Sequence, residues 1–299
     1  MMRSVKEYSV ALRKPDGEIE CKIEKISNFA DTHKWAKIPF IRGVVNFVDS
    51  LIIGISTINY SASFYEDEQE SGAVVAAENQ TDKQEGNGKA KPESQGHGAE
   101  IVTVLISLAL AVVLFMVLPF AVSRFFLKFT QSLLVLNIIE GIVRIVVFLV
   151  YLISISLMED IRRTFMYHGA EHKCINCIEN GQALTVDNVM KSSRFHKRCG
   201  TSFLFLVVII SIVVFMFIRV SNPALQLLIR LLMVPVIAGI SYEILRYAGS
   251  HDNALSAALS APGLCLQQLT TREPERDMCE VAITAVEAVF DWKAFLEKE

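Results

Sequence analysis

Charge is scarce in four long stretches of this sequence, at 101–122, 133–158, 201–218 and 224–245, and the first and third hold no charged residue at all. Hydrophobic residues make up 52% of the 299 residues, and the mean hydropathy is +0.39. Such clustered apolar sequence excludes an ordinary soluble domain. Each stretch has about the 20 residues that cross a ~30 Å hydrocarbon core. We therefore predict an all-α membrane protein with about four transmembrane helices in the lipid bilayer.

An excess of basic charge is also absent, since the formal net charge is −3. Nucleic-acid binders show a basic face, so we expect no nucleic-acid partner. Residues 1–42 lack the short apolar core of a signal peptide, and we expect this cytosolic N-terminal region to be retained. Its "RKPDGEIE" sequence at 13–20 has the turn residues of a hairpin, which predicts a small N-terminal β-hairpin region.

The segment 43–64 is long enough to cross a membrane, but polar residues recur along it at helical spacing. They are Asn46, Asp49, Ser50, Ser56, Thr57, Tyr60 and Ser63. A helix with one polar face suits the membrane interface or a re-entrant position better than full exposure to lipid. We therefore predict a re-entrant or interfacial helix here, with a fifth crossing as the alternative.

Basic residues are distributed unevenly among the segments that flank the apolar stretches. Residues 1–42 hold nine Lys or Arg and 159–200 hold seven, whereas 123–131 and 219–223 hold two and one. Short cytoplasmic segments accumulate Lys and Arg. Four crossings place both basic segments and both termini in the cytoplasm, whereas five would place 159–200 outside. We predict a cytoplasmic-membrane protein with four crossings.

Leu, Ile and aromatic residues are missing from 66–98, which hold eight acids and three lysines. We predict an acidic disordered linker over 65–99, between the 43–64 helix and a four-helix core at 100–248.

Residues 249–299 are predicted to form an interfacial segment followed by a cytosolic amphipathic helix, with Thr271 as a possible cap. The apolar face of that helix either packs on the protein itself or docks a partner. It comprises Met278, Val281, Ala282, Ala285, Val289, Trp292 and Leu296.

Histidine and cysteine are few, but several of them gather in "YHGAEHKCINC" at 167–177. On a helix, His168, Glu171 and His172 share one face, and Cys174 and Cys177 lie on the other side. The His-x-x-Glu-His spacing is that of inverted zinc hydrolases, in which two imidazoles bind the metal and the glutamate accepts a proton from water. We predict His168 and His172 as ligands of a divalent metal, Zn²⁺, and Glu171 as the general base.

Further ligands have to come from outside this helix. His196 and Cys199 precede the third apolar stretch, and an antiparallel return of the chain brings them toward His168. This second pair strengthens the metal interpretation over chance occurrence or a histidine that anchors in the headgroup region. Cys174 and Cys177 have the spacing of half a zinc ribbon, but they lack a second Cys-x-x-Cys. The six cysteines lie in segments predicted to be cytosolic, which is typical of reduced thiols.

Charged residues inside the predicted crossings are costly to insert in lipid and are therefore informative. Glu140 and Arg144 lie four residues apart on one helix face, so they either neutralise one another or serve transport. Arg230 is close enough to its helix end to snorkel. Glu243 lies at the predicted membrane depth of the histidines. Three roles are open for it: a metal ligand, a hydrogen-bond partner of a ligating histidine, or the ion-pair partner of a basic residue.

Five ordered segments resemble the YqhQ-like family of bacterial membrane proteins, whose members are labelled metal-dependent enzymes. They are "FIRGVVNFVDSLIIG", "YHGAEHK", "FHKRCGTSFLF", "GISYEILRYAG" and "PGLCLQQLTTREPERDMCEVAI". The resemblance implies that His168, Glu171, His172, His196, Cys199 and Glu243 are family-type positions. Cys174 and Cys177 depart from the family pattern. The resemblance implies a bacterial source but no particular reaction.

Three functions fit these observations. The first is a membrane metal hydrolase that acts on a peptide or lipid-derived substrate at the cytoplasmic membrane surface. The second is a non-enzymatic assembly factor whose metal or polar cluster is structural and whose surface binds another membrane protein. The third is a transporter that uses Glu140, Arg144 and Glu243.

Overall fold

The computed structural model describes residues 1–4, 6–26, 36, 38–78, 97–218, 220 and 222–297. The strands are β1 (Met2–Arg3), β2 (Glu7–Arg13) and β3 (Ile19–Lys25). The first helices are α2 (Ile41–Glu78), α3 (His97–Val112), η2 (Val113–Val117), α4 (Leu118–Phe125), η3 (Phe126–Lys128) and α5 (Leu133–Ser156). Those that follow are α6 (Glu159–Glu179), α7 (Val186–Lys191), α8 (Gly200–Met216), α9 (Pro223–Leu232), α10 (Val234–Ser250), α11 (Ala254–Thr270), α12 (Arg276–Val289) and α13 (Trp292–Leu296).

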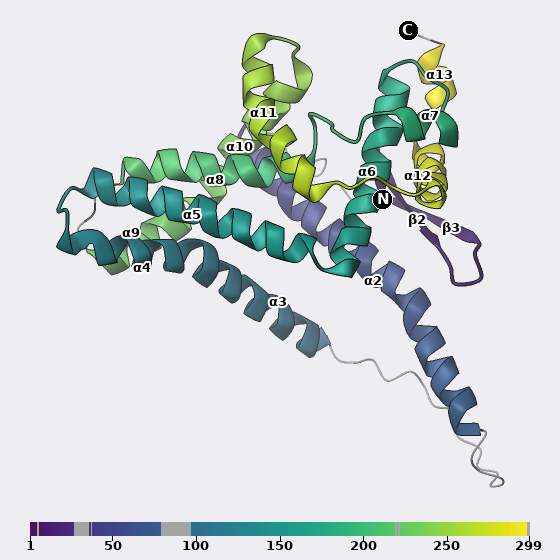
Figure 1. The fold of residues 1–299 in the computed structure, drawn as a ribbon, viewed down its shortest axis with the longest axis horizontal. Coiled ribbons are helices and arrows are strands. Elements are labelled where there is room, and N and C mark those ends of the chain that lie inside the picture. Colours follow the sequence, from purple (N-terminus) through teal and green to yellow (C-terminus); the bar gives the residue numbers. More distant parts are fainter. Residues whose placement is uncertain are drawn as a thin grey trace.

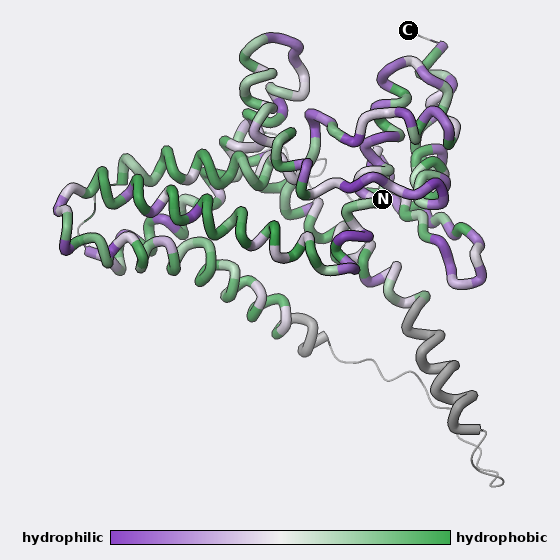
Figure 2. Tube along the Cα trace, viewed as in Figure 1, coloured by the Kyte–Doolittle hydropathy of each residue, from purple (hydrophilic) through white to green (hydrophobic). Residues whose placement is uncertain are grey.

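Apolar helices form one bundle. Helices α3, η2 and α4 follow one another, α4 packs on α5, and α8 packs on both α5 and α10 (Figure 1). Hydrophobic residues dominate these helices, whereas hydrophilic residues gather around α6, α7 and the sheet (Figure 2). By length and composition, three described helices can cross a membrane, or four when one bent pair is counted as a single span. The chain is therefore a helical membrane protein, as predicted.

The helices match the predicted crossings in position, but not all in shape. Val102–Lys128 and Leu133–Ser156 are long enough to cross, and the apolar Gly200–Met216 has 17 residues. The fourth crossing is bent by 41° between α9 and α10. Pro235 lies in the first turn of α10. A proline lacks the N–H for a bond to the preceding turn, and its ring collides with the carbonyl four residues earlier, so a bend is expected there.

Helix α2 passes the same length and composition test over Ile41–Phe64, but its contacts differ from those of the bundle helices. Its start packs on α10, and Ile53 packs on Tyr8 and Val10 of β2. The face away from the sheet exposes Val48, Leu51, Ile52, Ile55 and Ile58. Because Ile41–Phe64 also qualifies as a membrane span, the interfacial or re-entrant position of this helix stays a prediction.

The acidic linker predicted over 65–99 differs from the structure in part. Residues 65–78 continue helix α2, and α3 begins at His97. The remaining linker residues, 79–96, lie outside the described part of the chain.

The N-terminal segment forms a three-stranded antiparallel sheet in the order β1-β2-β3. The predicted hairpin at 13–20 joins β2 to β3, with Ser9 opposite Ile23. Gly17 has a φ of 90°, a conformation that residues with a Cβ rarely adopt, and the Lys14 N–H donates to the Glu18 carbonyl at 2.8 Å. Strand β2 packs on α12, where the Ser9 hydroxyl donates to the Ala285 carbonyl at 2.6 Å.

The C-terminal amphipathic helix is confirmed as α12, which packs against α6, α7 and the sheet. Its buried residues are Met278, Cys279, Val281, Ala282, Ala285 and Val286. The predicted cap was wrong, because Glu275 is the N-cap and Thr271 instead ends α11, its hydroxyl donating to the Gln267 carbonyl. The helix also stops at Val289 and restarts as α13, where Asp291 accepts from the Ala294 N–H.

Candidate metal centre

Helix α6 continues without a break through the His-x-x-Glu-His sequence. Its N-cap is Met158, directly after α5, so the helix leaves the bundle and enters the polar part of the molecule (Figure 1). His168 and His172 lie one turn apart on the same face, with ring centroids 4.4 Å apart. The sequence spacing therefore brings the two imidazoles together, as predicted from helical geometry.

Two backbone carbonyls orient these imidazoles. His168 Nδ1 donates to the Thr270 carbonyl at 2.9 Å, and His172 Nδ1 donates to the Arg194 carbonyl at 2.7 Å. With Nδ1 protonated, Nε2 of a neutral imidazole carries the lone pair that binds a metal. Metal-ligating histidines in proteins usually have such a partner on the other nitrogen.

The segment that supplies the Arg194 carbonyl is itself held against α6. Lys173 is buried and donates to the carbonyls of Met190 at 2.9 Å and Ser192 at 2.8 Å. Asn176, nearly one turn further along α6, donates to the carbonyls of Ser193 and Phe195. These bonds fix the segment along the helix, so that one of its carbonyls meets His172.

Cys199 completes the cluster from the start of α8. It is the N-cap of that helix, and its Sγ lies 3.3 Å from His168 Nε2. One ligand atom from each of His168, His172 and Cys199 lies within 4.8 Å of the others, and Cys199 is 3% exposed. The antiparallel return expected from the sequence therefore brings Cys199 to the histidine pair.

The electrostatics of the cluster favour an ionised thiol. Burial opposes ionisation, but hydrogen bonds and charges of His168 and His172 lower the pKa of Cys199 to about 5. Burial also disfavours a charged His168, yet the bond to the Cys199 sulfur raises the pKa of that imidazole to about 9. A thiolate is the form of cysteine that binds metals.

The donor set fits a transition-metal ion. Two imidazole nitrogens and one thiolate suit Zn²⁺, whose catalytic sites commonly have three protein ligands, including Cys₂His in alcohol dehydrogenase. Structural zinc sites almost always have four. Among the residues that the structure describes, the group of possible ligands around His168 has three members.

His196 comes close to this group but faces elsewhere. Its ring centroid is 5.9 Å from that of His172, and its Nε2 lies 3.1 Å from a Glu179 carboxylate oxygen. Both line a cavity of about 310 Å³, together with Lys197, Arg198 and Asp252. His196 was predicted as a ligand. Its position suits a histidine oriented by a carboxylate at the edge of the cluster, and its role as a metal ligand stays a prediction.

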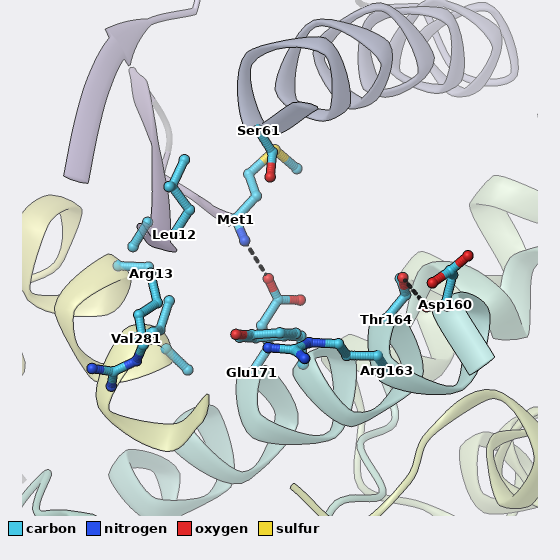
Figure 3. A pocket seen from close by; sticks show the side chains of 13 residues that line it. Met1, Leu12, Arg13, Ser61, Asp160, Arg163, Thr164, Glu171 and Val281 are labelled. Carbon is cyan, nitrogen blue, oxygen red and sulfur yellow. Dashed lines mark hydrogen bonds and ion pairs between the residues drawn. The ribbon is translucent and has the colours of Figure 1, made fainter. Parts of the chain in front are cut away.

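Glu171 turns away from the two histidines. Its carboxylate accepts from the Met1 amine at 2.5 Å and lines a cavity of about 490 Å³ between the sheet, α6 and α12 (Figure 3). Arg163 and Tyr167 of α6 line the same cavity. Residues three apart in a helix differ by about 60° in direction, and tertiary contacts decide which way a long side chain leans. The general-base role predicted for Glu171 has no support from this geometry.

Cys174 and Cys177 lie in an apolar core instead of a ligand cluster. Both are fully buried with Ala170, Cys279 and Ala282 between α6 and α12. Burial raises the pKa of each thiol, so both stay protonated at neutral pH. This placement disfavours the half-ribbon alternative.

The charged residues of the predicted crossings lie away from the cluster. Glu140 and Arg144 form a buried ion pair at 2.7 Å within the bundle. Glu243 accepts from the Arg42 guanidinium through both carboxylate oxygens, and this pair joins the start of α2 to α10. Of the three roles that the sequence left open for Glu243, the mate of a basic residue matches these contacts.

Sequence reasoning missed the residues that orient the ligands. The carbonyls of Thr270 and Arg194 carry no sequence signal, because every residue has a carbonyl. The position of Lys173, directly after the histidine motif, is a signal that the sequence does offer. A lysine in a half-apolar helix needs hydrogen-bond acceptors if the helix is packed on that side. The acid Glu179, seven residues after His172, is the other available signal, because i and i+7 lie on one face of a helix.

Comparison with known proteins places this chain in one family. Residues 38–292 match a family described as a protein of unknown function (DUF1385). The chain is 31% identical over 298 residues to the uncharacterized protein YqhQ of Bacillus subtilis (strain 168), an alignment that covers 97% of this chain and 89% of that protein. No solved structure matches. The chain therefore belongs to the DUF1385 family and resembles its Bacillus relative along nearly its whole length.

Proposed function

We propose that this protein is a membrane-bound metal-dependent hydrolase in which His168, His172 and Cys199 bind Zn²⁺. One observation carries the proposal: both imidazoles are oriented through Nδ1 by backbone carbonyls, and a thiol with a lowered pKa lies within 4.8 Å of a ring nitrogen of each. Preoriented imidazoles, which release a proton when a metal binds, and a thiolate are ligands that zinc prefers.

Three ligands favour a catalytic over a structural site. A fourth position that the protein leaves open is where a catalytic zinc holds water or substrate. A bound zinc would there lower the pKa of that water and polarise a carbonyl or phosphoryl oxygen. The described part of the chain contributes three members to the ligand group, which agrees with such an open position.

His196 and Glu179 are the proposed proton-transfer pair. A carboxylate oxygen of Glu179 lies 3.1 Å from His196 Nε2, and this contact orients the imidazole. The pair borders the cavity of about 310 Å³ beside the ligand cluster. In this proposal His196, and not Glu171, moves protons for the reaction, because Glu171 faces the cavity on the other side of α6.

The position of the site suggests the class of substrate. The cluster lies where α6 leaves the bundle and α8 enters it, so it is next to the predicted cytoplasmic membrane surface. A peptide or lipid-derived molecule that lies along that surface would reach the cavity without leaving the interface.

Metal analysis of the purified full-length protein tests the proposal. Prepared without chelator, the wild type should hold about one zinc per chain, whereas His172→Ala and Cys199→Ser should lose it. His251→Ala and Cys265→Ser are matched controls on exposed side chains and should keep it. A wild type that holds no transition metal would end the metal proposal.

The second candidate is a structural clasp, by which we mean a metal or polar cluster that holds helices together without catalysis. One observation favours it. His168, Cys199 and the Thr270 carbonyl tie together α6, α8 and the end of α11. His196→Gln separates the two functions. In a hydrolase the variant keeps its zinc and thermal stability but fails to complement a deletion strain. In a clasp the same variant complements fully.

A further inference from the structure

A second polar cluster lies inside the apolar bundle, away from the proposed metal centre. Arg144 of α5 and Arg230 of α9 both bond the carboxylate of Glu140, and the side chains of all three are at most 5% exposed. The side-chain amide oxygen of Asn137 also accepts from Arg230, at 3.1 Å. The rings of Phe120 and Phe215 cover the guanidiniums.

The charges in this cluster do not balance. Two guanidiniums face one carboxylate, which leaves one positive charge surplus in an apolar surrounding. The carboxylate of Glu243 in α10 does not neutralise this surplus, because it is bound to Arg42. A buried charge without a counter-charge costs several kcal/mol.

The hydrogen-bond donors do not balance either. Each guanidinium has five N–H groups. Arg144 meets three acceptors, the Phe115 carbonyl, the Ser211 hydroxyl and Glu140, and Arg230 meets two. Arg230 Nε is buried with no partner among the described residues. Half of the donors are therefore left without an acceptor in the described structure.

The helices around the cluster depart from regular α-helical geometry near two prolines, Pro119 and Pro235. Pro119 has no N–H to bond the Phe115 carbonyl four residues earlier, and that carbonyl instead accepts from Arg144 Nε at 3.1 Å. The π-helix η2 begins just before, at Val113. Such π-bulges are frequent at functional sites. The bend between α9 and α10 lies next to Val234, which lines a cavity together with Arg144.

A cavity of about 120 Å³ opens beside Arg144. Arg144 and Ser211 provide its polar wall, and the rest is lined by Phe115, Met116, Val207, Val208, Phe215, Val234 and Ile237. Since a water molecule occupies about 30 Å³ in the liquid, the cavity has room for a small ion and some water.

We propose that this cavity binds one small monovalent anion of the chloride class beside Arg144, the guanidinium of the cluster that lines it. The anion supplies the missing negative charge and accepts from N–H groups of Arg144 that no protein acceptor uses. The apolar walls exclude larger or doubly charged anions, which would have to be stripped of more hydration. The proposal is independent of the metal centre, because no residue is shared between the two sites.

Equilibrium binding of ³⁶Cl-labelled chloride to the full chain in nanodiscs of zwitterionic lipid tests the proposal. We expect saturable binding of about one chloride per chain at concentrations up to about 0.15 M, the physiological ionic strength. Unlabelled bromide should compete, and gluconate should not. Absence of saturable binding to the wild type would overturn the proposal.

Two variants locate the site and one controls for charge. Arg144→Gln removes the cationic wall and should weaken binding at least about tenfold, or about 1.4 kcal/mol. Val207→Phe fills the cavity, leaves every charge in place and should also abolish binding. Arg124→Gln removes a neighbouring arginine that bonds Gln226 and should bind like the wild type. Chloride binding that survives Val207→Phe in a folded protein would exclude this cavity.

Discussion

Cys199 differs from the other buried cysteines in what surrounds its sulfur. Apolar neighbours surround Cys174 and Cys279, and burial raises the pKa of Cys279 to about 11. Cys199 is equally buried but lies against His168 and His172 and accepts from the Thr201 N–H at the start of α8. Imidazoles and a helix N-terminus both stabilise a thiolate. The tertiary neighbours of Cys199 therefore favour its thiolate, the form that binds metals, whereas those of Cys174 and Cys279 favour the neutral thiol.

Thiolate absorbance of the metal-free protein measures this difference. The pKa of Cys199 is lowered, so its thiolate stabilises the fold in full above its ordinary pKa of 9.0, and this contribution is lost as the pH falls through about 5. The pKa of His168 is raised, so its cation stabilises the fold in full below 6.5, and its contribution is lost as the pH rises through about 9. We expect a titration step near pH 5 that Cys199→Ser abolishes and His168→Ala moves upward. A wild type with no thiolate below pH 7 would contradict the ion pair.

Glu171→Gln tests whether the glutamate of the motif takes part at the metal. Because its carboxylate faces Met1 and the cavity between α6 and the sheet, we expect zinc content equal to that of the wild type. His172→Gln, one residue further on, should lose the metal. Loss of zinc from Glu171→Gln, measured by elemental analysis of folded protein, would show that the glutamate moves to the ion.

At the scale of elements, α6 presents three different faces. One carries His168 and His172, one packs Ala170, Cys174 and Cys177 on α12, and one turns Glu171 to the sheet. The connection from α11 to α12 crosses this helix closely, since the Arg272 N–H donates to the Phe165 carbonyl at 2.9 Å. That crossing is what brings the Thr270 carbonyl to His168.

Gly169→Ala tests the close crossing. A Cβ at Gly169 would lie 2.1 Å from the Arg272 carbonyl oxygen, so the backbone has to move. We expect a stability loss of about 1–3 kcal/mol, as for overpacked cores. The Thr270 carbonyl would shift from His168 and metal affinity would fall. Gly200→Ala is the matched control, because a Cβ there meets nothing within 4 Å. A Gly169→Ala protein with wild-type melting temperature and zinc content would exclude the constraint.

At the scale of the molecule, two polar sites occupy different parts of one apolar bundle. The proposed metal centre lies at the end where α5 passes into α6 and the sheet packs on α2. The Glu140 cluster lies within the bundle, toward the loops that join α4 to α5 and α8 to α9. Among the described residues, the folded polar region lies at the first end, where the sequence predicts the cytoplasmic side.

Cysteine labelling in intact cells tests this orientation. Gln131→Cys lies in the exposed α4–α5 connection and Gln182→Cys in the exposed α6–α7 turn. In a background without native cysteines, an impermeant maleimide should label the first from outside and the second only after permeabilisation. In the wild type, Cys174, Cys177 and Cys199 should be protected. External labelling of Gln182→Cys would overturn the four-crossing topology.

Much of the architecture follows from the sequence. Apolar stretches of spanning length, the hairpin turn at Gly17 and the apolar face of 276–289 each rest on local patterns, because burial in lipid or core demands them. The break at Met233 was detectable from Pro235, whereas the π-helix before Pro119 was not. Helical spacing also determined that His168 and His172 share a face.

Only the tertiary structure decided the composition of each site. As further ligands beside His168 and His172, His196 and Cys199 had equal claims in the sequence. Packing brought Cys199 to the histidines, whereas His196 Nε2 contacts the Glu179 carboxylate. It also turned Glu171 away and joined Arg230 to Glu140 across 90 residues of sequence. Local patterns specify which face a residue occupies. The partner across that face depends on how distant segments cross, which close contacts and buried charges determine.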